Sequence, residues 1–378
     1  MQRQRLGYRF IMLFLCALAF SAVLFSCKGS AEAGYPFIIW KKPIKPGVNL
    51  SASPDGTFFS VVAPNGEITS YDLKGSLIWR KIFKNVTHVT IGRGGKSLIA
   101  FAKGDDKHRR VYLLNRNGRL IWRFAPRVAV VCADVSEAGR RGAFGTRDGY
   151  VYLCSFTRER PRFRRWRLPG TPASLSFSPD GEQLIVGLRN KGGVGAYTLR
   201  GQPTWLAEGD PKKTYVARYC ATGKYVLYHG CSADGNSSHL GILTPTGELI
   251  WSSELGGKDA KAAISYPGDY VAYGFSHEVA HKSRIASERF VRLYSLSGKR
   301  LWEQGGMLFK PFLVSLTPSG RTLVHDGKKS LAILNTTGRR IGHLAMPALV
   351  RRCEPSVNSG RTLVYCGDGW LYLVYAGG

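Results

Sequence analysis

Short apolar runs alternate with polar, glycine-containing turns along most of the chain. The runs at 58–62, 98–101 and 184–186 are three to five residues long and consist mainly of β-branched, aromatic and other apolar side chains. Ser-Pro-Asp-Gly turns at 53–56 and 178–181 are typical of the segments that separate them. Runs of this length and composition, bounded by such turns, are characteristic of β-strands in hairpins. The pattern therefore predicts an all-β protein.

A longer frame recurs as well, with a small polar residue first, glycine three positions later and tryptophan seven positions after the first residue. A glycine between two apolar runs marks a hairpin turn, because glycine adopts positive φ without steric cost. The tryptophan therefore occupies one fixed place on the strand after the turn. The frame is found at 72–79, 115–122, 198–205, 244–251 and 295–302, and 335–342 keeps the glycine without the tryptophan.

The spacing of the tryptophans defines the repeating unit. Between one tryptophan and the next, the turn signals leave room for four short antiparallel strands. Units of about 40–50 residues with four strands each are typical of the blades of a β-propeller. The tryptophans concerned are Trp40, Trp79, Trp122, Trp166, Trp205, Trp251 and Trp302, spaced by 39, 43, 44, 39, 46 and 51 residues.

The two ends of the chain determine the number of blades. Eight glycines mark first hairpins, from Gly56 to Gly360, but only three strands fit after Gly360. The run at 37–41 is a strand without a hairpin partner of its own, and it contains Trp40 as a fourth strand would. If this strand completes the last blade, the ring closes and two unpaired edges disappear. We therefore predict an eight-bladed propeller; seven blades with one decayed unit is the alternative that the strand count disfavours.

The predicted propeller covers residues 36–378. Its blades are expected at about 50–82, 86–125, 128–168, 171–207, 214–255, 259–304, 310–344 and 348–376, the last completed by 36–42.

The N-terminus has the features of an export signal. Three arginines without any acidic residue precede an apolar run at 10–25, which is shorter than the roughly 20 residues that span a bilayer. The segment 23–27 resembles the bacterial lipobox, so we expect a signal peptide at 1–27, lipidation of Cys27 and a polar tether at 28–35. Cleavage after Ala33 and an uncleaved anchor are the alternatives. All three place the propeller outside the cytoplasm, and lipidation would attach it to a bacterial cell or outer membrane, facing the periplasm.

The repeat resembles the pyrroloquinoline-quinone-type eight-bladed propellers, in which a tryptophan docks between blades after an Asp-x-x-Thr-Gly turn. Here the turn at 72–75 is one residue shorter, and the Ser-Pro-Asp-Gly hairpins are similar to WD40 repeats. In size and plan the chain is similar to the scaffold lipoproteins of the outer-membrane β-barrel assembly machinery. The resemblance implies blade-docking tryptophans and a monomeric, non-catalytic ring. It also implies a protein partner in the cell envelope and a role in envelope protein assembly.

Enzymatic alternatives have weaker support in the sequence. Quinoprotein dehydrogenases of similar fold carry a vicinal disulfide, and no Cys-Cys pair occurs here, so no cofactor is expected. Residues 277–281 read His-Glu-Val-Ala-His, which on a helix would place two imidazoles on one face to bind zinc. Because the motif falls in a turn at 276–288 with no domain behind it, we expect a solvated loop. His277, Glu278 and His281 remain the metal candidates.

The charge of the chain suggests a second class of partner. The formal net charge is +29, and without the three arginines of the first 27 residues it is 51 − 25, or +26. Such an excess favours lipopolysaccharide or anionic lipid as a partner, whereas nucleic acid is not expected for an exported protein. The densest basic cluster either binds phosphates or protects an outer edge strand from pairing. It comprises Arg158, Arg160, Arg162, Arg164, Arg165 and Arg167.

The cysteines allow one disulfide prediction. Cys353 and Cys366 flank the Gly360 hairpin almost symmetrically, so they could face each other on adjacent strands. An extracytoplasmic compartment would permit the bond.

Overall fold

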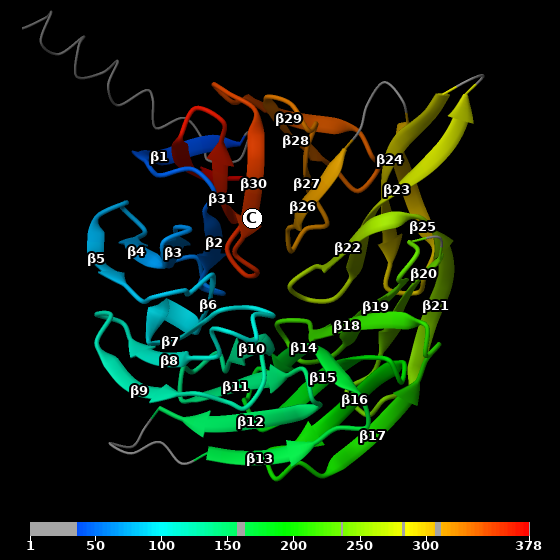
Figure 1. The fold of residues 1–378 in the computed structure, drawn as a ribbon. Helices are drawn as coiled ribbons and strands as arrows, with labels where there is room; N and C mark the ends of the chain where they lie inside the picture. The colour runs from blue at the N-terminus through cyan, green and yellow to red at the C-terminus, as the bar shows by residue number, and fades with distance from the viewer. Residues whose placement is uncertain (1–35, 157–162, 236, 282–283, 307–310, 378) are drawn as a thin grey trace, which may run out of the picture. The chain divides into compact units, whose positions relative to one another are not determined.

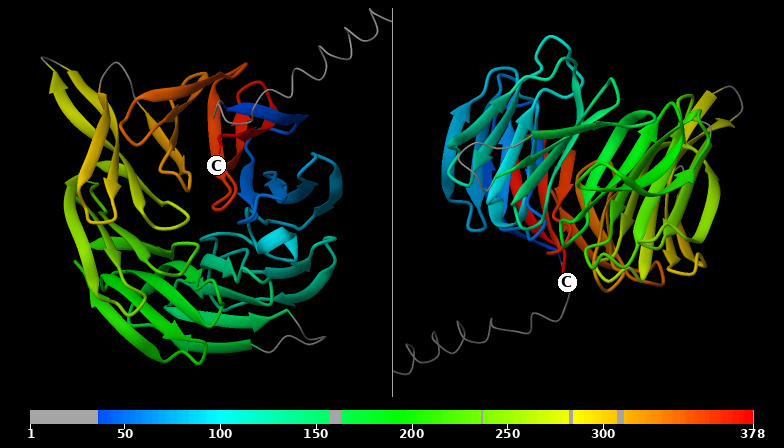
Figure 2. Two further views of the ribbon diagram at one scale, coloured as in Figure 1. Left: turned by 180° about the vertical axis from the view of Figure 1, so that it is seen from behind. Right: turned by 90° about the horizontal axis from the view of Figure 1, so that it is seen from below.

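The described part of the chain is a ring of eight four-stranded antiparallel sheets (Figure 1). The computed structural model describes residues 36–156, 163–235, 237–281, 284–306 and 311–377. Viewed from the side, the strands run between the two faces of the ring (Figure 2). This part contains a single helical turn, η1 (Arg93–Gly95). The predicted all-β, eight-bladed propeller is confirmed.

Blades 1 to 4 each use four consecutive strands. They are β2 (Asn49–Ala52), β3 (Phe58–Val62), β4 (Glu67–Asp72), β5 (Leu77–Ile82); β6 (His88–Ile91), β7 (Ser97–Phe101), β8 (Val111–Asn115), β9 (Leu120–Phe124); β10 (Val130–Val135), β11 (Arg141–Thr146), β12 (Tyr150–Ser155), β13 (Phe163–Arg167); and β14 (Thr171–Phe177), β15 (Gln183–Arg189), β16 (Gly193–Thr198), β17 (Pro203–Glu208).

Blades 5 to 7 follow the same order, and blade 8 draws on both ends of the propeller sequence. They are β18 (Lys213–Tyr219), β19 (Val226–Ser232), β20 (Ser237–Leu243), β21 (Leu249–Gly256); β22 (Lys258–Ile264), β23 (Tyr270–His281), β24 (Arg284–Ser295), β25 (Arg300–Gly306); β26 (Phe312–Leu316), β27 (Thr322–His325), β28 (Ser330–Leu334), β29 (Arg340–Ala345); and β30 (Val350–Pro355), β31 (Arg361–Cys366), β32 (Trp370–Tyr375) with β1 (Phe37–Pro43).

The ring closes in blade 8, where β1 forms the outer strand beside β32 (Figure 1). The two strands pair antiparallel from Phe37↔Tyr375 to Pro43↔Trp370, with a bulge between Ile38 and Trp40. An N-terminal strand therefore completes a C-terminal sheet, as the sequence predicted. Because this pairing joins residues more than 300 positions apart, it fixes the last blade to the first.

Burial follows the position of a strand within its blade. All five residues of β3 and all five of β7 are buried, because neighbouring blades cover both faces of these middle strands. In the outer strand β5 only Trp79 is buried. The hydrophobic core is accordingly a set of layers between blades, such as the cluster that joins Phe58 of blade 1 to Leu98 of blade 2.

Tryptophans of outer strands join neighbouring blades. The ring of Trp40 lies against Gly75, the turn glycine of the next blade, and its Nε1 donates to the Leu73 carbonyl at 3.0 Å. Gly75 has φ of 78°, and a Cβ there would lie 2.9 Å from the indole, so the turn requires glycine for two reasons. Among the described residues the same packing occurs in the pairs Trp79–Gly118, Trp166–Gly201, Trp205–Gly247, Trp251–Gly298 and Trp302–Gly338.

Blades 2 and 7 depart from this arrangement. In β29 Gly342 occupies the tryptophan position, since it pairs with Ile333 as Trp302 pairs with Leu293. The following blade is blade 8, whose third and fourth strands come from opposite ends of the propeller and so form no hairpin to pack on. Trp122 of blade 2 is 36% exposed and lies 6.2 Å from Phe163 of blade 3, between ring centroids.

The tryptophan contact gives a testable stability prediction. Trp40→Ala should lower the free energy of unfolding by about 3–5 kcal/mol, because it removes a buried indole and its hydrogen bond at the ring closure. Trp122→Ala, at the equivalent position but more exposed, is the matched control and should cost less than half as much. Urea denaturation measures both, and equal losses would contradict a special role for the closure contact.

Candidate functional site: the inner wall and its two pockets

The first strand of each blade lies nearest the centre of the ring (Figure 1). We call β2, β6, β10, β14, β18, β22, β26 and β30 the inner wall. A pocket of about 270 Å³ lies at one end of this wall, beside the turns between first and second strands. Its lining includes Pro54, Asp134, Leu175, Arg218 and Asn358, which belong to five different blades.

Ionisable side chains from separate blades meet on the inner wall. Enclosure by protein raises the pKa of Asp134 to about 7, against the effect of the Phe177 amide, which donates to its Oδ2 at 2.8 Å. Burial likewise raises the pKa of Glu354 to about 7, although Lys261 and Arg218 favour its charged form. Carboxyl groups with pKa values near 7 are suited to proton transfer. The hydrogen bonds of the inner wall show whether these groups serve such a role or a structural one.

Those contacts join one blade to the next. Asp134 accepts from the backbone of blade 4, and Ser174 of blade 4 accepts from the Ala217 amide of blade 5 at 2.9 Å. Arg218 donates from blade 5 to the Ala262 carbonyl of blade 6 at 2.7 Å. Asn49 accepts from Arg352 of blade 8 and donates to the Thr87 carbonyl beside blade 2 at 2.7 Å. The polar groups of the inner wall thus hold the blades in register.

A second pocket, of about 530 Å³, lies at the opposite end of the inner wall, and we call it the mouth pocket. Lys103, Arg147 and Arg189 line it, with no acidic residue among its lining. Burial, together with the positive charges of Lys103 and Arg352, lowers the pKa of nearby His88 to about 4. The lining of the mouth pocket is therefore basic.

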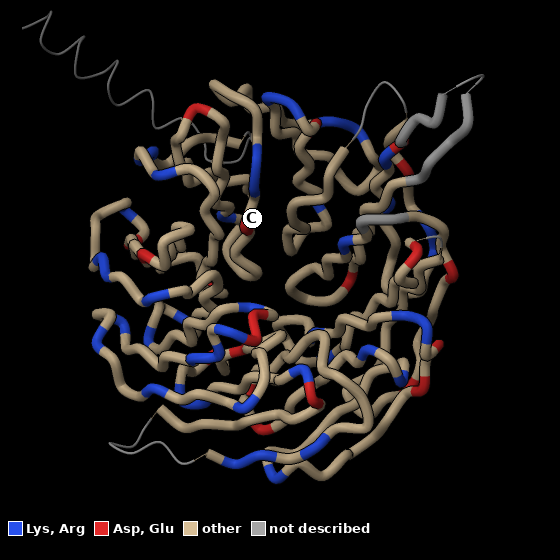
Figure 3. Tube along the Cα trace, viewed as in Figure 1, with Lys and Arg blue, Asp and Glu red and all other residues tan. Residues whose placement is uncertain are grey.

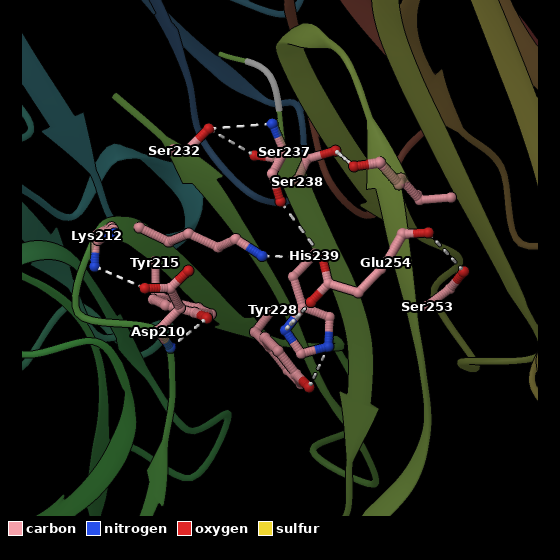
Figure 4. A network of polar contacts seen from close by, with 12 residues as sticks. Asp210, Lys212, Tyr215, Tyr228, Ser232, Ser237, Ser238, His239, Ser253 and Glu254 are labelled. Atoms are coloured by element: carbon pink, nitrogen blue, oxygen red, sulfur yellow. Dashed lines mark hydrogen bonds and ion pairs between the residues drawn. The ribbon is translucent and has the colours of Figure 1, made fainter. Parts of the chain in front are cut away.

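Figure 4 shows a polar network in blade 5 that includes Tyr228, His239 and Glu254. Lys213 is 5% exposed, and its Nζ lies 2.8 Å from Glu254 Oε2. His239 Nδ1 lies 3.9 Å from the same carboxylate, and its Nε2 is 3.5 Å from the Tyr228 hydroxyl. Lys213, Tyr228, His239 and Glu254 come from all four strands of the blade. The network thus stabilises the blade through contacts among non-adjacent strands.

Part of the predicted arginine cluster lies on β13, the outer strand of blade 3. Arg164, Arg165 and Arg167 are exposed there, and the Arg165 guanidinium lies 5.4 Å from the centre of the Tyr150 ring. The remaining members, Arg158, Arg160 and Arg162, lie outside the described residues, as do Cys27 and the rest of the N-terminal signal. Figure 3 shows lysines and arginines spread over the blades rather than gathered on this strand.

The His-Glu-x-x-His segment adopts a different structure from the expected loop. It lies at the end of β23, which pairs with β24 as far as His281↔Arg284. Four residues along a strand span about 13 Å, whereas along a helix they span about 6 Å. The spacing that brings two imidazoles together on a helix is therefore absent, and the predicted solvated turn is corrected to a long hairpin. The described residues contain no group of three or more His, Cys, Asp or Glu placed to hold a metal ion.

The predicted disulfide between Cys353 and Cys366 is not formed in the structure, where both are free thiols. Cys353 pairs with Val364, and Cys366 pairs with Val350 across a register shift in β30. The two cysteines are therefore diagonal neighbours rather than opposite ones, and such neighbours lie about 7–8 Å apart between Cα atoms. A disulfide needs a closer approach.

The thiol state can be tested directly. Alkylation of the unfolded protein without reductant should modify both Cys353 and Cys366, because register keeps them apart. Mass analysis of the peptides, with a reduced sample as control, would detect this. A peptide pair linked through these residues would contradict the observed register.

The raised pKa of Asp134 gives a prediction about pH. The pKa of Asp134 rises from 3.8 to about 7 on folding, so the folded state binds this proton more tightly than the unfolded state does. The resulting contribution to the free energy of unfolding is fully present below about pH 3.8 and is lost as the pH rises through 7. Asp134→Asn should therefore gain stability over the wild type at about pH 8 and gain less at about pH 5, measured by urea midpoints. Asp180→Asn is the control, because the pKa of Asp180 is lowered by its bond to Ser178. Its effect should be similar at both pH values, and a gain for Asp134→Asn independent of pH would refute the argument.

Comparison with solved structures supports the fold. BamB from Moraxella catarrhalis superposes with a TM-score of 0.65 at 17% identity, covering 90% of this chain and 97% of that one. The C-terminal WD40 domain of Sif2 gives 0.68 at 14% identity, covering 92% and 99%. Hydrazine synthase from Kuenenia stuttgartiensis gives 0.54 at 9% identity, covering 86% and 94%. Identities this low show a shared fold alone, and the presence of an enzyme among these structures means that the fold does not decide the activity.

No protein-family model matches the chain, and no curated protein matches it. The predicted similarity to BamB-like and WD40-like propellers is confirmed at the level of fold. None of the described helical residues forms a helix long and apolar enough to cross a membrane.

Proposed function

We propose that the protein is a non-catalytic interaction scaffold of the bacterial envelope, anchored by a lipid at Cys27. The observation that carries the proposal is the contrast between the two ends of the inner wall. Asp134 and Arg218 are engaged in contacts between blades, whereas the mouth pocket presents cations to solvent. A rigid ring with an open, charged mouth is suited to binding a partner, because function in such folds is carried by the surfaces that the scaffold positions.

The envelope location is inferred from the N-terminal sequence. A basic start, a short apolar run and a lipobox-like segment support export and lipidation. The resemblance to scaffold lipoproteins of the β-barrel assembly machinery, together with the fold shared with BamB, supports a role in envelope protein assembly.

A second candidate function is binding of lipopolysaccharide or anionic lipid. Arg164, Arg165 and Arg167 favour it, because they are exposed on one outer strand where guanidinium groups could contact phosphates. The competing explanation is protection of the edge strand from pairing with other sheets.

The proposal is tested by purifying the full-length protein from native membranes at low and at high salt. We expect a diacylglyceryl-modified Cys27 and an envelope protein partner that remains bound at high salt. Cys27→Ser is the matched control and should release the protein from membranes without unfolding the propeller. An unmodified N-terminus with only salt-labile anionic lipids bound would overturn the scaffold proposal and favour the second candidate.

A further inference from the structure

We propose that the mouth pocket binds an acidic, partly apolar peptide segment of the partner. The inference rests on the proposed scaffold function and specifies its binding site. The pocket is separate from the arginine cluster on β13, because its lining comes from other strands and turns of blades 2 to 5.

The first support is charge without compensation. Among the described residues, neither the Lys103 ammonium nor the Arg189 guanidinium has a hydrogen-bond or ion-pair partner. Both are exposed at the pocket, and no Asp or Glu is part of its lining. An incoming carboxylate would be attracted by these two unpaired cations.

The second support is a guanidinium that is already fixed in place. Arg147 forms an ion pair with Asp106 and donates to the Gly104 carbonyl at 2.6 Å. These contacts neutralise part of its charge but hold its side chain at the edge of the pocket. A fixed donor loses less conformational entropy when a ligand binds than a free side chain does.

The third support is the remainder of the lining. Val131, Pro172 and Val216 supply apolar surface, and Thr171 and Thr214 add hydroxyl groups. The volume of about 530 Å³ lies within the range of about 300–1,000 Å³ found for ligand pockets. A concave pocket of this size with an apolar wall fits a few side chains of a peptide better than the flat surface of a bilayer.

The test measures binding of a fluorescent peptide of alternating Glu and Leu to the full-length, detergent-solubilised protein by anisotropy. Lys103→Ala with Arg189→Ala should weaken binding roughly tenfold, as expected for two exposed charge contacts. Arg164→Ala with Arg165→Ala removes two exposed cations elsewhere and should leave binding unchanged. A Gln-for-Glu peptide should bind weakly, and added salt should weaken the acidic peptide.

A further variant separates the pocket from its charge. Ala173→Phe places a bulky ring in the lining without changing any charge and should also weaken peptide binding. Thermal unfolding confirms that each variant is folded. If the Lys103→Ala, Arg189→Ala variant and the Arg164→Ala, Arg165→Ala variant lose peptide affinity equally, the attraction is unspecific and the proposal is overturned. Binding of inorganic phosphate or of anionic vesicles can be measured with the same variants. If that binding depends on Lys103 and Arg189 as strongly as peptide binding does, the proposal is overturned in favour of a phosphate ligand.

The outcome also separates this inference from the scaffold proposal. If the Lys103→Ala, Arg189→Ala protein still retains its partner from native membranes, the pocket is not the binding site and the scaffold proposal stands. If the wild type binds the peptide through the pocket but retains no membrane partner, the scaffold proposal fails and the peptide site stands.

Discussion

Packing of a tryptophan on the turn glycine of the next blade is the contact on which the ring depends. Each blade is a twisted sheet with two faces, and it buries both only when neighbours cover them. The indole of Trp40 fills the space left by Gly75 and donates to the backbone of the same turn. The contact recurs at six of the eight interfaces between the described blades and helps to set the separation and tilt of those blades. Closure by β1 then fixes the last blade to the first.

Ring closure also decides what the inner wall contains. Once the blades are in register, their first strands converge, and side chains far apart in the sequence become neighbours. Asp134, Arg218 and Asn49 then bond to the backbone of adjacent blades. The carboxyl of Asp134 is enclosed enough for its pKa to rise to about 7, and its bond to the Phe177 amide offsets part of that cost. The inner wall is therefore charged and at the same time structurally engaged.

The mouth pocket differs because Lys103 and Arg189, two of the three cations in its lining, are not engaged in this way. Lys103 and Arg189 lie at or just after the ends of second strands, and among the described residues neither side chain has a hydrogen-bond or ion-pair partner. Because the polar groups of the inner wall stabilise the fold, the exposed polar groups at its rim are the ones that remain available for binding a partner. In this protein the rim is basic, consistent with a net charge of +29.

The amino-acid sequence determined the repeat, the number of blades and the way the ring closes. These features follow from local signals, namely turn glycines, strand periodicity and the position of Trp40 before the first complete blade, and such signals depend on near neighbours. Tertiary structure decided the rest. The register of β30 against β31 placed Cys353 opposite Val364 and not Cys366, and strand pairing extended β23 through the His-Glu-x-x-His segment. Lys103 and Arg189 line one pocket, and Lys213 pairs with Glu254, although the residues of each pair are about 40 or more positions apart in the sequence. Their proximity depends on the radial arrangement of complete blades, which no local pattern specifies.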